Sequence, residues 1–241
     1  MISIIVPIYN EETTIRDFIY NLYCLYDIKK HEVIFVDGGS KDKTLDILEE
    51  LSYFGYSYHV SAKKGRANQM NFGAKISHGD ILWFVHADSV LQKDVIQKVI
   101  DCPTEVGCLK IKFYPNSFPM RVNSIVSNMR ASITNLAFGD QALFLSREAF
   151  EKVGGYRDMP IMEDYRISED LSANGYKITV IDSSVTTSTR RYKGHVKKTM
   201  WQMQKYQKMY RRGVPVEEIA KMLAGDQVTQ AALTQAKELL K

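Results

Sequence analysis

The sequence predicts an α/β fold built on a mostly parallel sheet. Short, almost continuously apolar segments recur at residues 2–8, 32–37 and 80–87, which is typical of strands covered on both faces. Residues 11–27 and 41–53 lie between them and carry apolar side chains at helical spacing. Alternation of strands and helices indicates βαβ units. With 241 residues, 45% of them hydrophobic, the chain is long enough to bury one sizeable core.

The remaining elements follow in order, and the composition of the sequence changes near residue 105. We expect Ser40 to cap the helix over 41–53. The further elements that we expect are a strand at 57–60, helices at 66–76 and 92–101, a strand at 106–113, a helix at 120–137, a strand at 142–145, helices at 146–153 and 163–174, and a strand at 177–181. The helix over 120–137 is amphipathic, and one face carries Val122, Ile125, Val126, Met129, Ile133 and Leu136. From about residue 195 the chain reads as helical, with breaks near 213–215 and 225–226.

Charge is distributed unevenly along the chain. The net charge is +4, yet no acidic residue occurs between Asp182 and Glu217, so the rest of the chain is mildly acidic. A basic strip of this kind predicts an anionic partner, such as phosphate groups, a membrane surface or nucleic acid. The strip holds nine basic residues: Arg190, Arg191, Lys193, Lys197, Lys198, Lys205, Lys208, Arg211 and Arg212.

Cysteine usage and the N-terminus bear on the compartment. Cys24, Cys102 and Cys108 form no CxxC pair, which favours a reducing cytoplasm and argues against a metal cluster. The first residues carry no signal-peptide pattern, and no apolar run approaches the roughly 18 residues of a spanning helix. We therefore expect a cytoplasmic protein, with peripheral contact to the inner face of the membrane as an option that the basic strip leaves open.

Polar residues follow three of the predicted strands, at the sheet edge where α/β proteins bind ligands. Glu11 follows the first strand, Asp37 ends the second, and His86 and Asp88 follow the strand at 80–87. The chain has neither a GxGxxG after the first strand nor a GxxxxGK[ST], which argues against dinucleotide enzymes and P-loop NTPases.

These segments together resemble the family 2 glycosyltransferases, which have the GT-A fold. The resemblance covers about residues 1–180. It rests on Pro7-Ile8-Tyr9-Asn10-Glu11, Val36-Asp37-Gly38-Gly39-Ser40-Lys41-Asp42-Lys43-Thr44, Gly65-Arg66-Ala67-Asn68-Gln69-Met70-Asn71-Phe72-Gly73-Ala74, His86-Ala87-Asp88 and Met162-Glu163-Asp164. It implies a catalytic domain over 1–190, with a nucleotide-binding half at 1–105 and an acceptor half at 106–190, followed by a basic helical extension at 191–241.

A narrower similarity links the chain to a bacterial subgroup, the selenodomain-associated transferases. The segments that carry it are Gly65-Arg66-Ala67, Gly139-Asp140-Gln141, Pro160-Ile161-Met162-Glu163-Asp164 and Thr187-Ser188-Thr189-Arg190-Arg191-Tyr192. This closer match names no acceptor.

The resemblance implies that five residues bind the donor nucleotide. Pro7, Tyr9 and Glu11 would line the base and ribose, and Asp37 would accept a hydrogen bond from the base. Arg66, at the start of a predicted helix, would contact the diphosphate. From the residues alone, Asp37 before two glycines also reads as a simple turn, and Arg66 as a solvated surface charge. Asn71 and Gly73 match a family motif that we expect to hold a loop rather than touch the ligand.

The resemblance also implies a divalent metal, Mg²⁺ or Mn²⁺, bridging the two phosphates of the donor. Asp88 is the expected ligand, because such cations prefer carboxylate oxygens. Many family members have Asp-x-Asp here, and this chain has His86 in place of the first carboxylate. His86 would face the ribose or lie in the core. His195, on a predicted loop, would complete the metal shell.

Asp164 is the expected general base, with Glu163 as its supporting neighbour. Transfer with inversion needs a carboxylate opposite the leaving diphosphate. The alternative is that both are helix-start acids placed by the helix dipole. The resemblance also places Asp140 and Gln141 near the donor sugar or acceptor hydroxyls, and Arg190 and Arg191 on the diphosphate.

We expect the protein to be an inverting hexosyltransferase that uses a UDP-sugar. The sequence does not identify its acceptor. The basic strip at 190–212 is either a solvated helix face or an interfacial helix on anionic lipid, and nucleic acid is not expected as a partner. One rival is a non-catalytic module that binds nucleotide sugars or acts as a scaffold. A sugar-phosphate nucleotidyltransferase is the second rival, but it needs a glycine-rich, arginine-containing loop after the first strand, and residues 7–11 do not provide one.

Overall fold

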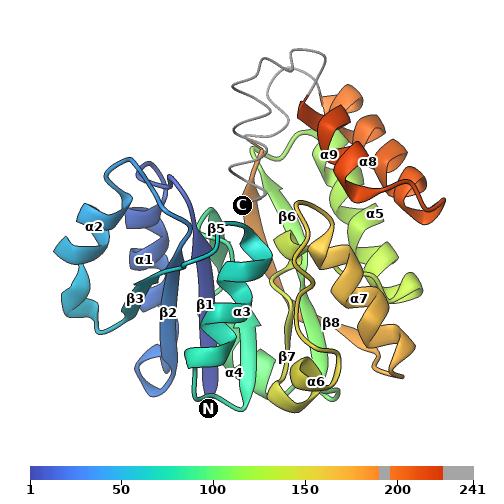
Figure 1. Cartoon of the computed structure of the whole chain (residues 1–241). Helices are drawn as coiled ribbons and strands as arrows, with labels where there is room; N and C mark the ends of the chain where they lie inside the picture. The colour runs from blue at the N-terminus through green and yellow to red at the C-terminus, as the bar shows by residue number, and fades with distance from the viewer. Residues whose placement is uncertain (190–195, 225–241) are drawn as a thin grey trace.

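The computed structural model describes residues 1–189 and 196–224, and it confirms the predicted α/β class (Figure 1). In the described residues an eight-stranded sheet has the order β3-β2-β1-β4-β7-β6-β8-β5. Its strands are β1 (Ile2–Ile8), β2 (Glu32–Asp37), β3 (Ser57–Val60), β4 (Ile81–Phe84), β5 (Ser89–Leu91), β6 (Val106–Tyr114), β7 (Phe144–Ser146) and β8 (Ile178–Ser188). The helices are α1 (Ile15–Tyr23), α2 (Thr44–Glu50), α3 (Arg66–Ile76), α4 (Val95–Ile100), α5 (Phe118–Thr134), α6 (Arg147–Lys152), α7 (Glu163–Ala173), α8 (Val196–Arg211) and α9 (Val216–Ala224).

The sheet is mostly parallel and runs through both halves of the chain. Strand β1 pairs in parallel with β2 and β4, β2 with β3, and β6 with β8. Antiparallel pairing of β4 with β7, where Leu82 lies opposite Leu145, joins the first half of the chain to the second. Because β1, β2 and β4 point the same way, their carboxyl ends meet at one edge of the sheet (Figure 1).

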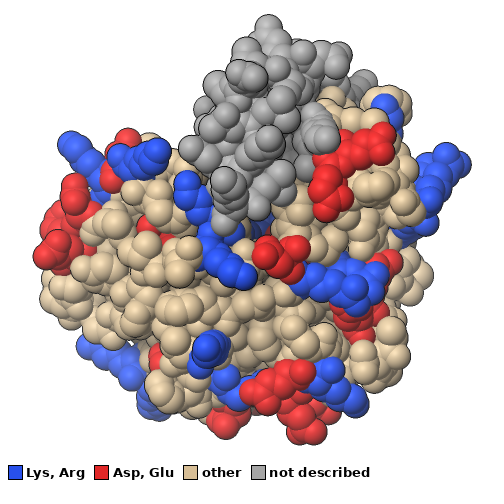
Figure 2. All heavy atoms as spheres, in the orientation of Figure 1, with Lys and Arg blue, Asp and Glu red and all other residues tan. Residues whose placement is uncertain are grey.

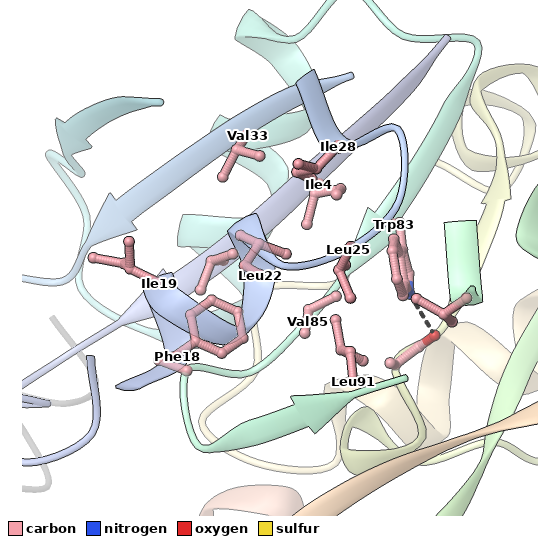
Figure 3. Packing of buried hydrophobic residues seen from close by; sticks show 14 of the residues in the cluster. Ile4, Phe18, Ile19, Leu22, Leu25, Ile28, Val33, Trp83, Val85 and Leu91 are labelled. Carbon is pink, nitrogen blue, oxygen red and sulfur yellow. Dashed lines mark hydrogen bonds between the residues drawn. The ribbon is translucent and has the colours of Figure 1, made fainter. Parts of the chain in front are cut away.

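Helices cover both faces of the sheet, as the apolar strands predict. Ile4 of β1 packs in one buried cluster with α1, α2 and α4, whereas Ile5 packs on the other face with α3, α6 and α7. Trp83 of β4 lies fully buried in the first cluster and donates a hydrogen bond from Nε1 to the carbonyl of Ala142 at 3.1 Å (Figure 3). This bond fixes the chain just before β7 against the centre of the sheet.

Several element boundaries differ from the sequence prediction. The short strand β5 was not predicted, and it pairs with β8, which lies far along the chain. Strand β8 extends to Ser188 rather than ending near residue 181. Ser40 does not cap α2, which begins at Thr44. Instead the Ser40 hydroxyl bonds Asp37, and the Asp42 carboxylate accepts the Thr44 N–H at 3.0 Å.

The amphipathic helix α5 turns its apolar face outward. Its predicted face is exposed from Val122, at 41%, to Ile133, at 74%, but Leu136, also predicted for this face, lies beyond the end of the helix and is buried. The inner side contacts β6 and β8, and there Asn128 accepts from the Ile111 N–H at 2.8 Å and donates to the Ile111 carbonyl at 3.3 Å. Strand β7 pairs with β6 only at residues 106–107, so the polar side of α5 serves a strand edge beyond that point.

Helices α8 and α9 pack against the second half of the molecule. Tyr210 of α8 meets Tyr165 of α7 edge to face, with ring centroids 5.3 Å apart, and Arg211 donates to the Tyr165 hydroxyl at 2.6 Å. Tyr206 of α8 donates to the carbonyl of Met222 in α9 at 3.3 Å. Within the described ranges, no helix is both long enough and apolar enough to cross a membrane.

Candidate active site

A pocket of about 490 Å³ opens at the carboxyl ends of β1, β2 and β4. It gathers segments from five separate parts of the sequence, including the start of α3 and the residues that lead into α7. Its walls are formed by Pro7, Ile8, Tyr9, Glu11, Gly38, Lys64, Gly65, Arg66, Gln69, His86, Ala87, Asp88, Met159, Pro160, Ile161 and Glu163. Seven of these residues are ones that the sequence singled out: Pro7, Tyr9, Glu11, Arg66, His86, Asp88 and Glu163.

The loops after β1 and β2 are tied to each other by polar contacts. Asn10, in a left-handed backbone conformation with φ 53°, donates from its N–H to the Ser40 hydroxyl at 2.9 Å and accepts the Lys41 N–H at 2.8 Å. The Glu11 N–H donates to the Thr44 hydroxyl at 2.8 Å. These bonds hold the two loops as one wall of the pocket, which explains why short polar residues occur at these positions.

Asp37 is fully buried beneath this wall. Its carboxylate accepts the N–H groups of Gly39 and Ser40 at 2.8 and 2.9 Å, and the Ser40 hydroxyl as well. This is the turn that the residues alone suggested. The nucleobase contact implied by the family resemblance stays a prediction.

Gln69 is a structural residue of the site that the sequence analysis missed. Its side-chain amide lies on α3, is 4% exposed, and donates to the carbonyls of Ile8 and Val36 at 2.7 Å each. A Cβ at Gly38 would lie 3.1 Å from this amide. Gln69 therefore ties the ends of β1 and β2 together, and Gly38 leaves it room. A polar residue on the buried side of a predicted helix was the available signal.

The family motif on α3 fastens the helix to its surroundings. Asn71 donates to the Tyr156 carbonyl at 2.7 Å and accepts the Tyr156 N–H at 2.9 Å. A Cβ at Gly73 would lie 2.5 Å from Cγ2 of Ile5 in β1. Asn71 thus holds the segment at Tyr156 and Gly73 allows close packing on β1, which are the structural roles that we expected.

Arg66 and Glu163 form an ion pair across the pocket. Two nitrogens of the guanidinium, Nε and Nη2, bond Oε1 of Glu163, whose side chain is 3% exposed, while the Arg66 side chain is 34% exposed. Burial raises the pKa of Glu163 above its ordinary value, Arg66 opposes this, and the Asp164 carboxylate adds to it. Burial disfavours the charge on Arg66, but Glu163 and Asp164 outweigh burial and leave the pKa of Arg66 raised. Arg66 thus faces the pocket while it compensates a buried carboxylate.

Asp164 lies at the start of α7 beside the Gly139 loop. The residue before α7's first turn, Met162, has φ 66°, so the chain turns sharply into the helix. One carboxylate oxygen of Asp164 accepts the Gly139 N–H at 2.8 Å. A Cβ at Gly139 would lie 3.1 Å from the His86 ring and 3.4 Å from Asp164. Glycine at 139 therefore lets these two side chains approach one another.

Asp140 and Gln141 occupy a short 3-10 turn, Gly139–Gln141, next to Asp164. Asp140 is partly exposed. Gln141 is fully buried and accepts from Arg130 Nη2 at 3.1 Å, and Arg130 itself stacks on Phe138 at 3.6 Å. In this conformation the sugar contact expected of Gln141 does not fit, because its amide is enclosed by protein. Gln141 instead positions the loop that carries Asp140.

Asp88 follows β4 at the floor of the pocket and accepts from the Thr187 hydroxyl at 3.4 Å. The described residues contain no group of three or more His, Cys, Asp or Glu side chains arranged to hold a metal ion. This donor set still fits Mg²⁺ or Mn²⁺ in one common arrangement, in which one carboxylate and the substrate phosphates share the ion. Asp88, with His86 beside it in the same wall, would hold the ion in that case.

Three predicted site residues lie outside the described residues: Arg190, Arg191 and His195. Their expected roles on the diphosphate and the metal stay predictions. Lys64 is a further cation in the pocket wall that the sequence analysis did not select. It precedes the motif at 65–74, and no spacing distinguished it from a surface lysine.

Comparison with known proteins agrees with this geometry. Residues 3–102 match the family model described as Glycosyl transferase family 2. A curated relative from Methanococcus voltae, a dolichyl N-acetyl-alpha-D-glucosaminyl phosphate 3-beta-D-2,3-diacetamido-2,3-dideoxy-beta-D-glucuronosyltransferase, is 26% identical over 159 residues, which cover 62% of this chain and 49% of that protein. Other relatives are also named glycosyltransferases, and the chain spans about half the length of most of them.

Solved structures share the fold along nearly the whole chain. S. aureus TarS in complex with UDP-GlcNAc superposes with a TM-score of 0.65 at 18% identity, covering 98% of this chain and 70% of that one. The mannosyltransferase PcManGT from Pyrobaculum calidifontis, in complex with GDP-Man and Mn²⁺, gives 0.68 at 19% identity, covering 99% and 69%. The fold is therefore the GT-A fold that these solved structures have. The match to glycosyl transferase family 2 covers residues 3–102 of the 241 in the chain.

Proposed function

We propose that this protein is an inverting hexosyltransferase that takes its sugar from UDP. The observation that carries the proposal is the single pocket in which Tyr9, Arg66, Asp88 and Glu163 meet at the carboxyl edge of the sheet, with Asp164 adjoining. An aromatic side chain, cations and carboxylates in one concave site suit a base, a diphosphate and a sugar. The structural neighbours carry UDP-GlcNAc in one case and GDP-Man in the other, which supports a nucleotide sugar as donor.

The proposed reaction is a displacement at the anomeric carbon. Asp164 accepts the proton of an acceptor hydroxyl, the hydroxyl oxygen forms a bond to the anomeric carbon on one face, and the bond to the diphosphate breaks on the other. The Gly139 N–H, which bonds Asp164, keeps that carboxylate oriented. Arg66 and Lys64, which both line the pocket, offer positive charge to the diphosphate. A divalent ion held at Asp88 would offset the negative charge that develops on the departing diphosphate.

The basic strip supports two further roles in this proposal. Arg190 and Arg191 would close on the diphosphate, and His195 would join the metal. The exposed Trp201 and its neighbour Lys205, whose amine lies 5.5 Å from the indole centroid, would suit peripheral contact with anionic lipid.

The test is product analysis with purified protein. Incubation with UDP-sugars, Mn²⁺ and a panel of sugar and lipid-linked acceptors should release UDP and yield a glycoside of inverted anomeric configuration by proton NMR. Release of pyrophosphate in a parallel incubation with UTP and a sugar 1-phosphate would instead indicate the nucleotidyltransferase rival. Tight donor binding without any UDP release across the panel would favour the non-catalytic module.

A further inference from the structure

Helix α5 carries an apolar stripe that faces away from the protein. The stripe repeats at helical spacing over 16 positions, which corresponds to about 22 Å along the axis. Its members are 41 to 78% exposed: Phe118, Val122, Ile125, Val126, Met129 and Ile133. Contiguous apolar surface of this kind marks an interaction site.

The stripe cannot simply rotate inward. Asn128, on the opposite side of α5, bonds both the N–H and the carbonyl of Ile111 on the edge of β6. Ala131, on the same inner side, is fully buried. Turning the helix to bury the stripe would free the backbone of Ile111 and place a large side chain where Ala131 now packs. The outward orientation is therefore a stable property of the fold.

The charged residues in the sequence segment that contains the stripe are all basic. No acidic residue occurs between Glu105 and Asp140, whereas this interval contains Lys110, Lys112, Arg121 and Arg130. Lys112 and Arg121 are exposed, while Lys110 pairs with Asp182 at 2.6 Å. By contrast, the face in Figure 2 shows acidic and basic side chains interspersed around its periphery. An apolar stripe with exposed cations fits an anionic partner.

The charge pattern also decides between partners. A second copy packed on this stripe would bring together two surfaces whose segment 106–139 contains cations and no acid to compensate them. Lipid phosphates supply the missing negative charge, and an acyl boundary accepts the apolar side chains. A lipid interface can take up the apolar face of a single helix without a matching groove.

We propose that α5 lies in the headgroup region of an anionic bilayer, with the stripe inserted and Lys112 and Arg121 at the phosphates. The helix begins just after Tyr114 of β6, which lies opposite Ser188 of β8. One residue earlier on β8, the hydroxyl of Thr187 donates a hydrogen bond to the pocket residue Asp88. The membrane-facing helix thus starts at the sheet edge that holds the site.

Vesicle co-sedimentation of the full chain tests the proposal. The wild type should bind phosphatidylcholine vesicles containing phosphatidylglycerol more tightly than pure phosphatidylcholine vesicles. Ile125→Glu/Met129→Glu should weaken that binding at least about tenfold, because two inserted side chains are lost. Lys112→Gln/Arg121→Gln should weaken it by about fivefold per residue, and only on anionic vesicles.

Matched controls locate the binding surface. Val60→Glu and Val90→Glu alter side chains that are 57% and 54% exposed on β3 and β5, and they should bind vesicles like the wild type. Lys205→Gln/Lys208→Gln removes charge from α8 alone. The proposal would be overturned if the wild-type protein did not bind vesicles, or if the stripe variants bound them as well as the wild type. It would also be overturned by loss of binding confined to the α8 variant, or by stripe variants that only split a dimer in light scattering.

Discussion

Asp88 is the residue on which the proposed metal depends. It lies in the pocket wall, where the residue two positions earlier is His86 rather than a second carboxylate. With this donor set the ion would be held jointly by the protein and the donor's phosphates, so metal and nucleotide binding should be linked. A metal effect without nucleotide should be small.

Replacing Asp88 by alanine should therefore remove most of the gain that Mn²⁺ gives to UDP binding. A ligand at one hundred times its dissociation constant adds about 2.7 kcal/mol to the unfolding free energy, so the effect is measurable as a rise in melting temperature. The experiment compares the shift by UDP with and without Mn²⁺ in wild type and variant. Asp94→Ala, which removes an exposed partner of Lys98, is the control. An intact metal increment in Asp88→Ala would assign the ion elsewhere.

The pair of Arg66 and Glu163 gives a prediction about pH. Removing one partner of a buried pair typically costs 3–5 kcal/mol, and because Arg66 is 34% exposed we expect Arg66→Met to lose about 2–3 kcal/mol of unfolding free energy at pH 8. The pKa of Glu163, already raised by burial, should rise further without its cation. A carboxyl with a raised folded-state pKa favours the fold when protonated, so the loss should shrink as the pH falls toward 5.

Urea unfolding of Arg66→Met between pH 5 and 8 measures this dependence. Adding Glu163→Gln to that variant should recover stability at pH 8, because no charge is left buried. Arg16→Met, which breaks the exposed pair with Glu50, should change little at any pH. A pH-independent loss in Arg66→Met would mean that packing, rather than the uncompensated charge, is responsible.

At the scale of elements, α5 shows what a sequence pattern predicts about a helix and what it does not. The periodicity of α5 correctly predicts a helix with one apolar face, and it does not say which way the face points. Burial usually decides that question, but the neighbour of α5 is the edge of β6, whose backbone needs polar partners. Asn128 supplies them, and the apolar face is left outside.

Asn128→Ala should consequently destabilise the protein by about 1–3 kcal/mol, the cost of leaving buried backbone groups unpaired. Amide hydrogen exchange at Ile111 should accelerate in the same variant. Ser132→Ala, at an exposed position of the same helix, should be close to neutral. Unchanged exchange at Ile111 in Asn128→Ala would show that other groups protect the edge.

The same scale explains which elements could be predicted. The buried parallel strands β1, β2 and β4 appear in the sequence as apolar runs, and α3 has the predicted bounds. The three-residue strand β5 and the outer half of β8 pair with each other over a long sequence separation and are rich in Ser and Thr. Their strand character comes from tertiary pairing, which a local window does not contain.

At the scale of the whole molecule, the site was predicted by its residue types and not by its internal bonds. The sequence indicated Asp37, Arg66 and Glu163 as site residues. It could not show that Asp37 is enclosed by its own turn, that Arg66 faces Glu163 across the pocket, or that Gln69 ties two strands. Such pairings join positions up to 97 residues apart, and only the folded chain brings them together.

The central claim is that Asp164 serves as the base for sugar transfer. Asparagine at 164 keeps the size of the side chain and an oxygen for the Gly139 N–H, but it does not accept a proton at neutral pH. General-base catalysis typically contributes about 10²- to 10⁴-fold, so transfer should fall by that order, while UDP-sugar affinity should barely change because the role exists only in the transition state.

The most direct measurement is single-turnover transfer, with donor affinity measured on the same protein samples, for wild type and Asp164→Asn. The account predicts a rate lowered at least about 10²-fold with an unchanged dissociation constant for the donor. Near-normal transfer by the variant would contradict it and direct attention to Asp140 or Glu163. Loss of donor binding as large as the loss of rate would contradict it equally, because Asp164 would then be shaping the pocket rather than taking the proton.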